Sequence, residues 1–350
     1  MAGRIGVLTS GGDCPGLNAV IRAVVRRAIM RHEFDMVGIL RGWRGLMDGL
    51  VTSLDLDAVS GILPRGGTIL RTSRTNPFIH DRGPERILEN AEEFELDAVI
   101  AIGGDDTMTV AHKLHSQYGL KVIGVPKTID NDVWGTDYTF GFDTTVNIAM
   151  EAIDRIHTTA ESHDRVMVVE VMGRDSGWIA LYAGVAGGAD IIIIPENPLG
   201  VDEICEQIQH RHDRGKDFSI AVVAEGASLV PTRGAEPRQI TNGKGKDELG
   251  HPHLGGIGKE LASEIEALTG YDTRVTVLGH TQRGGSPTGF DRVLGTRYGV
   301  LAADLAMAGK FGLMTALCGD KVEPISLEEV AGNVRRVPEE MFDIAATFFG

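Results

Sequence analysis

Short runs of consecutive apolar residues recur along the chain, separated by glycine-rich turns and helical patterns. In residues 17–30, apolar side chains recur at helical spacing, and a second helix is predicted from the glycines at 103–104 to about residue 115. The predicted strands cover residues 5–8, 36–40, 98–102, 122–125, 166–171, 190–194 and 220–224. Because these runs are apolar throughout, they predict parallel strands covered on both faces. Strands that alternate with helices favour a doubly wound α/β fold.

Residues 228–256 break this pattern. The segment is rich in Gly, Pro, Lys and Asp and shows no apolar period. We expect a long loop there, either disordered or functional.

Composition narrows the function classes. The 34 basic and 49 acidic residues leave a net charge of −15, which argues against nucleic acid or an anionic membrane as a partner. The 46 glycines in 350 residues are about twice the usual share of roughly 7%. Such an excess predicts many tight turns and close backbone approaches, as in ligand-binding α/β enzymes.

Three scattered cysteines without a CxxC pair predict neither a zinc site nor a disulfide framework. The first residues lack the layout of a signal peptide, and no apolar run approaches ~18 residues. We therefore expect a reduced, cytoplasmic protein.

Three segments follow predicted strands, at the edge where open α/β sheets bind ligands beside helix N-termini. They are residues 11–13, 103–107 and 126–132. Paired glycines let backbone N–H groups approach a phosphate, although none of these segments is a Walker A loop. Taken alone, each Gly-Gly-Asp motif favours an ordinary strand-to-helix turn.

The third segment, Pro-Lys-Thr-Ile-Asp-Asn-Asp, is more specific. Asp130 and Asp132 suit a division of labour in which one takes a proton from a hydroxyl and the other helps to hold a metal. Lys127 adds positive charge for a phosphoryl group. A turn whose Asp and Asn residues cap a helix is the alternative interpretation.

A series of motifs between residues 5 and 316 resembles 6-phosphofructokinase in sequence and in order. The motifs are GVLTSGGDCPGLNAVIR, RGGTIL, IGGDDT, PKTIDND, TFGFDTTV, ESHDR, VEVMGRDSGW, AEG and TRVTVLGHTQRGGSP. The resemblance implies two doubly wound lobes with mostly parallel sheets and an active site in the cleft between them. A phosphoryl-donor lobe would cover residues 1–141 and about 276–315, and a sugar-phosphate lobe 142–275 with its long loop 228–256. Residues 316–350 would form a C-terminal segment.

The resemblance also implies roles in phosphoryl transfer, which depends on positioning and charge stabilisation. Asp130 would take the proton from the 1-hydroxyl of fructose 6-phosphate, and Thr128 would contact the transferring group. Arg174 would stabilise the charge that develops on that group. Asp105 and, less directly, Asp132 would hold Mg²⁺.

Further residues match the sugar-phosphate site of the family. Arg274, His280 and Arg283 would hold the phosphate, with Arg165 reaching across from a neighbouring subunit, so a homodimer or homotetramer is expected. The remaining matches are Met172, Gly173 and Glu225, the last as an acceptor for sugar hydroxyls.

The phosphoryl donor depends on two positions. Relatives that use ATP typically have glycine where this chain has Asp106, and often glycine where it has Lys127, although some carry the lysine. A carboxylate would repel the α-phosphate of a nucleotide, and a lysine would neutralise pyrophosphate. The other donor-binding matches are Gly11, Gly12, Gly104 and Arg74.

The resemblance therefore implies fructose 6-phosphate and pyrophosphate as substrates, with fructose 1,6-bisphosphate and phosphate as products. The alternatives are an ATP-dependent 6-phosphofructokinase, an enzyme similar to lipid or NAD kinases, and a non-catalytic sugar-phosphate sensor. A lipid- or NAD-kinase-like enzyme lacks support because the PKTIDND and GHTQRGG motifs serve a sugar phosphate. A non-catalytic sensor lacks support because Asp130 and Arg174 are both present.

Overall fold

The computed structural model describes residues 3–349, and the chain divides into two compact units. The first unit comprises Met1–Thr144, Glu248–Gly250 and Arg283–Arg335. The second comprises Thr145–Asp247, His251–Gln282 and Arg336–Gly350. No helix within residues 3–349 is long and apolar enough to cross a membrane.

The first unit is built on a seven-stranded sheet with the order β15-β14-β5-β4-β1-β2-β3. Its strands are β1 (Arg4–Thr9), β2 (Asp35–Ile39), β3 (Val51–Ser53), β4 (Ala98–Gly103), β5 (Val122–Pro126), β14 (Leu313–Cys318) and β15 (Lys321–Ser326). The inner pairs are parallel, whereas β3 and β15 run antiparallel at the two edges. This arrangement confirms the predicted α/β class with mostly parallel strands.

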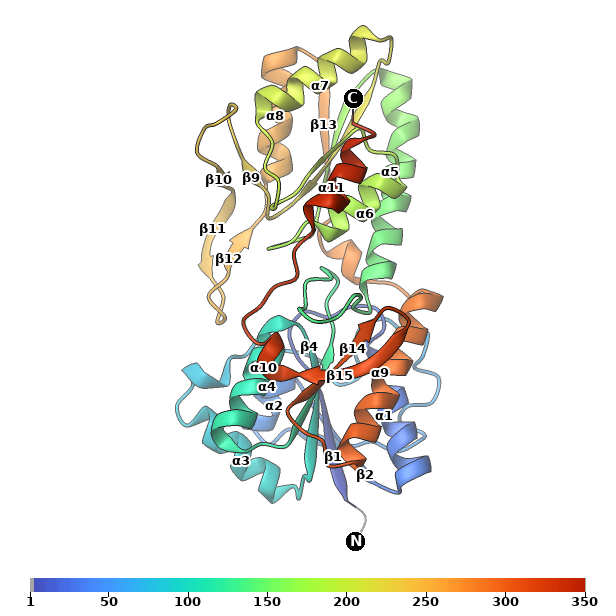
Figure 1. The fold of residues 1–350 in the computed structure, drawn as a ribbon, viewed down its shortest axis with the longest axis vertical. Helices are drawn as coiled ribbons and strands as arrows, with labels where there is room; N and C mark the ends of the chain where they lie inside the picture. The colour runs from blue at the N-terminus through green and yellow to red at the C-terminus, as the bar shows by residue number, and fades with distance from the viewer. Residues whose placement is uncertain (1–2, 350) are drawn as a thin grey trace. The chain divides into compact units, whose positions relative to one another are not determined.

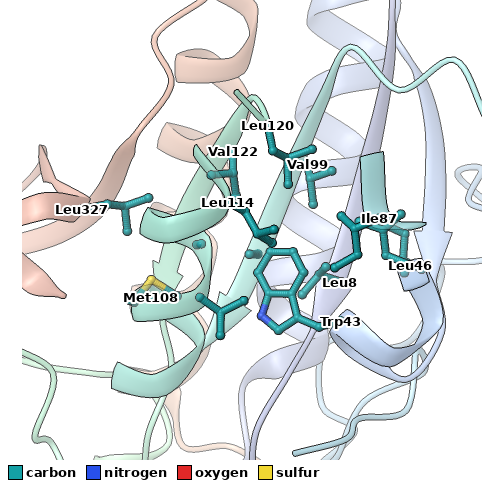
Figure 2. Packing of buried hydrophobic residues seen from close by; sticks show 14 of the residues in the cluster. Leu8, Trp43, Leu46, Ile87, Val99, Met108, Leu114, Leu120, Val122 and Leu327 are labelled. Atoms are coloured by element: carbon teal, nitrogen blue, oxygen red, sulfur yellow. The ribbon is translucent and has the colours of Figure 1, made fainter. Parts of the chain in front are cut away.

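Helices cover both faces of this sheet. They are α1 (Leu17–His32), α2 (Gly42–Met47), α3 (Gly83–Glu93), α4 (Asp105–Tyr118), α9 (Gly289–Met307) and α10 (Leu327–Val330). Helices α1 and α9 pack together on one face, and α3 and α4 lie on the other (Figure 1). Figure 2 shows the core beneath α4, where Trp43, Met108 and Leu114 pack against Leu8 and Val99 of the sheet.

The second unit contains a four-stranded, all-parallel sheet with the order β13-β6-β8-β7. Its strands are β6 (Val166–Val171), β7 (Ile191–Ile193), β8 (Ser219–Ala224) and β13 (Thr273–Val277). Its helices are α5 (Phe142–His163), α6 (Trp178–Ala186), α7 (Val201–Asp213), α8 (Ile257–Thr269) and α11 (Glu339–Ala346). Strands β6 and β8 are buried along their whole length, which explains their continuous apolar runs.

Residues 228–256, expected to form a long loop, contain short strands. The segment forms two short antiparallel pairs, β9 (Ser228–Leu229) with β10 (Arg238–Gln239) and β11 (Thr241–Lys246) with β12 (Pro252–Leu254). Strands this short, with exposed polar residues on β10, give no apolar alternation for sequence analysis to detect.

Candidate active site

Three neighbouring strands of the first sheet end at the same edge. Thr9 of β1 pairs with Ile102 of β4, and Gly103 pairs with Pro126 of β5. Because the strands are parallel and in step, the loops that follow them leave from one edge. The three segments predicted to bind the donor are these loops, so the structure brings them together.

The loop after β1 depends on glycine. Gly11 has a φ of 83°, in the left-handed region that glycine adopts without strain. A Cβ atom on Gly12 would lie 2.7 Å from Nη1 of Arg283, which donates a hydrogen bond to the Asp13 carbonyl at 3.2 Å. The absent side chain therefore lets a guanidinium group pack on the loop.

Lys127 links the loops after β1 and β5. Its side chain is buried, and its Nζ donates a hydrogen bond to the carbonyl of Gly12. Burial lowers the pKa of this amine, and the nearby Arg283 and Arg74 lower it further. The structure thus gathers three predicted cationic residues around the ends of β1 and β5.

The loop after β5 is held in an unusual conformation at Asn131, whose φ is 53°. The Asn131 Oδ1 accepts a hydrogen bond from the Thr139 N–H at 2.9 Å, and the Asp130 N–H donates to Thr128 Oγ1 at 3.1 Å. Asn tolerates left-handed backbone better than most residues. Asn131 therefore forms a turn in the backbone between Asp130 and Asp132.

Asp130, Asp132 and Asp105 form a group of carboxylates. The pKa of Asp132 is raised well above its usual value by burial, and then by the charges of Asp130 and Asp105. Its buried Oδ1 accepts no hydrogen bond from any described residue. A cation would balance the carboxylate charges and give the Asp132 Oδ1 a partner, so these residues fit a divalent metal ion.

Within residues 3–349, no three His, Cys, Asp or Glu side chains converge closely enough to enclose a metal.

The first turn of α4 borders a narrow pocket. Asp106 and Arg74 both line it, together with Gly11 and Thr107. Gly104 is the N-cap residue of α4, and the backbone N–H groups at a helix N-terminus favour an anion. The predicted donor-binding residues therefore share one region of the first unit.

The second unit brings the ends of β6 and β8 together. Val171 pairs with Ala224, and the Glu225 N–H donates to the Val171 carbonyl at 2.8 Å. A Cβ on Gly226 would lie 1.8 Å from the carbonyl oxygen of Arg174. The segment that contains Met172, Gly173 and Arg174 therefore lies directly beside Glu225, as the predicted sugar site requires.

Arg165 and Arg274 form a separate cationic group. Asp272 holds both: its Oδ2 is 2.6 Å from Nε of Arg165, and its Oδ1 contacts Nη1 of Arg274. The hydrogen bond from Arg165 lowers the pKa of this carboxyl.

The two ends of β6 are far apart. Arg165 precedes this strand and Arg174 follows it. Within one chain the six residues of the strand therefore separate them by roughly 20 Å. Arg274 lies with Arg165, near the start of β13, rather than with His280 beyond its end.

Residues 4–306 match the model described as phosphofructokinase. The chain belongs to the phosphofructokinase family. The resemblance inferred from the motifs is thereby confirmed.

Close relatives of this phosphofructokinase carry two kinds of name. A pyrophosphate–fructose 6-phosphate 1-phosphotransferase from Amycolatopsis methanolica is 54% identical, over 99% of this chain and 100% of the relative. An ATP-dependent 6-phosphofructokinase 3 from Streptomyces coelicolor is 50% identical, over 97% and 98%. Overall sequence identity therefore does not indicate which phosphoryl donor the chain uses. Individual residues at the donor site have to indicate it.

Solved structures share the fold. Phosphofructokinase of Pichia pastoris in the T-state superposes with a TM-score of 0.81 at 32% identity, covering 99% of this chain and 36% of that longer chain. A pyrophosphate-dependent phosphofructokinase from Nitrosospira multiformis gives 0.83 at 21% identity, covering 97% and 87%.

Sequence analysis missed residues that support the site. The Arg335 N–H donates to the Asp132 carbonyl at 2.8 Å, and its Nη1 donates to the Asn131 carbonyl at 3.2 Å. In the second unit, buried Gln282 accepts a hydrogen bond from the Met172 N–H at 3.4 Å. Arg335 lies some 200 residues from the loop it braces, and no local pattern marks it. Gln282 lies inside the GHTQRGG motif, which could have indicated it.

Proposed function

We propose that this phosphofructokinase transfers a phosphoryl group from pyrophosphate to the 1-hydroxyl of fructose 6-phosphate, giving fructose 1,6-bisphosphate and phosphate. The observation that carries the choice of donor is the pairing of Asp106 and Lys127 around the donor loops. Lys127 is buried against the Gly12 carbonyl, and Asp106 lines the pocket beside α4. Relatives that use ATP typically have glycine at the position of Asp106 and often at that of Lys127, although some carry the lysine. The two side chains therefore remove space or add charge where a nucleotide would extend.

The chemistry needs a base and compensation of charge. Asp130 takes the proton of the 1-hydroxyl while the hydroxyl oxygen forms a bond to phosphorus. The bridging P–O bond of pyrophosphate then breaks and releases phosphate. Thr128 contacts the transferring group, and Arg174 balances the negative charge on its oxygens. Asp105 and, less directly, Asp132 would hold Mg²⁺, and the ion would neutralise the donor phosphates.

Residues of the second unit would bind the sugar phosphate. Glu225 beside Met172–Arg174 would accept hydrogen bonds from sugar hydroxyls, and His280 and Arg283 would bind the phosphate. Arg165 and Arg274 lie at the opposite end of their strands from Arg174. We assign both to the site of a neighbouring subunit, so the active enzyme is at least a homodimer.

An ATP-dependent reaction is the second candidate, because ATP-dependent relatives are also about half identical to this chain. Initial rates with each donor distinguish the candidates. We expect the purified protein to form fructose 1,6-bisphosphate with pyrophosphate and to run the reaction in reverse with phosphate. Activity with ATP and none with pyrophosphate would contradict the proposed donor.

A further inference from the structure

The tip of the β11–β12 ribbon has no role in the proposed chemistry, yet it is well formed. The Asp247 N–H donates to the His251 carbonyl, and the His251 N–H donates to Asp247 Oδ1, both at 3.0 Å. The three residues between them, Glu248–Gly250, cluster with the first unit. This tip is therefore a closed turn that forms part of the unit that contains the donor loops.

Leu249 of the tip lines the pocket beside α4. The other walls include Arg74 and Asp106, and the apolar residues Trp43 and Val110. The free volume that remains is about 10 Å³, room for about one water molecule. Pockets that bury ligands of nucleoside size or larger usually enclose about 300–1,000 Å³. This pocket, as its walls stand, therefore has no room for a nucleoside.

A contact between two side chains lies on the other side of the tip. Nε2 of His80 lies 3.4 Å from Oε2 of Glu248. His80 follows the short helix η1 (Pro77–Ile79) of the first unit and is about a quarter exposed. Exposed pairs of this kind contribute little stability, so the contact orients the tip more than it fixes it.

We propose that Leu249 is a specificity-determining residue, which caps the donor pocket so that a diphosphate anion fits at the glycine loops but the nucleoside of ATP does not. The inference rests on the proposed function and adds a second barrier to ATP. Asp106 acts by charge on the phosphates, whereas Leu249 acts by volume on the group beyond them. Their effects should therefore be separable.

The test compares ATP binding and ATP turnover in Asp106→Gly and in the double variant Asp106→Gly/Leu249→Ala. We expect the double variant to bind ATP, and to use it by kcat/KM, about 10- to 100-fold better than the single variant. Inorganic tripolyphosphate, which has no nucleoside, should show no such gain. Equal ATP binding by the single and double variants would overturn the proposal.

The control is Asp106→Gly/Leu268→Ala, because Leu268 is an exposed leucine on α8. It should behave as Asp106→Gly does, and a gain equal to that of the Leu249 variant would also overturn the proposal. Thermal unfolding of all variants checks that they fold. ATP binding tests the cap without turnover, whereas turnover of pyrophosphate by the unaltered enzyme tests the proposed function, so the two failures are distinguishable.

Discussion

Asp130 and Asp132 are two residues apart and have different surroundings. The Asp130 N–H is held by Thr128 Oγ1, whereas Asp132 is buried with its pKa raised by burial and by its two carboxylate neighbours. A buried acid that gains from a nearby cation suits metal binding, which leaves Asp130 as the base. The division of labour predicted from the motif is consistent with these surroundings and remains a prediction.

Replacing Asp130 tests the assignment of the base. We expect Asp130→Ser to lower kcat about 10²- to 10⁴-fold while fructose 6-phosphate still binds. Steady-state kinetics and calorimetric binding of the sugar phosphate measure the two effects. Asp154→Ser, on the exposed face of α5, is the matched control and should leave kcat unchanged. A kcat for Asp130→Ser close to that of the control would rule out the base role.

Residue types and spacing predicted the donor loops but not their supports. Three strand ends marked by glycine and aspartate were sufficient to place Gly11, Gly104 and Asp130 at one sheet edge. Arg335 and Leu249 come from distant parts of the chain, and their contacts exist only after folding. Neither lies in a motif, so the sequence gives no signal for them.

At the scale of elements, the contact between the ends of β6 and β8 leaves no room for a side chain at Gly226. Gly226→Ala should destabilise the protein by about 1–3 kcal/mol and disturb Arg174, since backbone has to move. The control is Gly289→Ala, at the first position of α9 with nothing within 4 Å of the added carbon. Denaturant unfolding should show a loss for the first variant and none for the second. Equal stabilities would show that the two segments can separate without cost.

Helix α9 begins with a buried acid whose charge should make stability depend on pH. Burial raises the pKa of Asp291 from 3.8 to about 6, although its Oδ2 accepts a hydrogen bond from the Thr144 N–H at 2.9 Å. Since the folded state binds this proton more tightly than the unfolded state, stability is greatest at low pH and falls as pH rises from about 4 past 6.

The Asp291→Asn variant lacks this ionisation. We expect the stability of the unaltered protein relative to the variant to fall by about 1 kcal/mol between pH 5 and pH 7.5. Unfolding midpoints of both proteins at the two pH values provide the measurement. A difference that stays constant or grows with pH would contradict the buried, proton-binding state of Asp291.

The elements that sequence analysis found are those with continuous apolar runs, such as β4, β6 and β8, and their positions are confirmed within one or two residues. It left β3, β13, β14, β15 and the ribbons of residues 228–256 unassigned. Most of these strands are short or lie at sheet edges, with exposed residues on them. Strand β14 is an exception, because it is an inner, largely buried strand whose apolar run is interrupted by Thr315. Half-exposed edge strands bury too little surface to impose an apolar pattern.

At the scale of the whole molecule, the net charge of −15 describes the surface and not the site. Lys127, Arg283 and Arg74 act on one another at the donor loops, and Asp272 holds Arg165 and Arg274 together in the second unit. An acidic protein can therefore carry local basic groups for phosphate substrates.

The assignment of Arg165 to a neighbouring subunit predicts complementation. Asp130→Ser and Arg165→Ala should each be nearly inactive alone. When the two variants are mixed, unfolded and refolded together, hybrid oligomers contain subunits of both. Some of their sites would then have both residues intact, and turnover should return. Refolding each variant separately is the control. Failure to regain activity in a mixture shown to contain hybrid oligomers would place Arg165 in the site of its own chain.

The most direct test of the central claim is a competition between donors, followed by phosphorus NMR. The unaltered protein is given fructose 6-phosphate, Mg²⁺ and equal concentrations of pyrophosphate and ATP. We predict that the pyrophosphate signal declines while phosphate and the sugar 1-phosphate signal grow, and that ATP stays intact. Consumption of ATP with pyrophosphate unchanged would contradict the account.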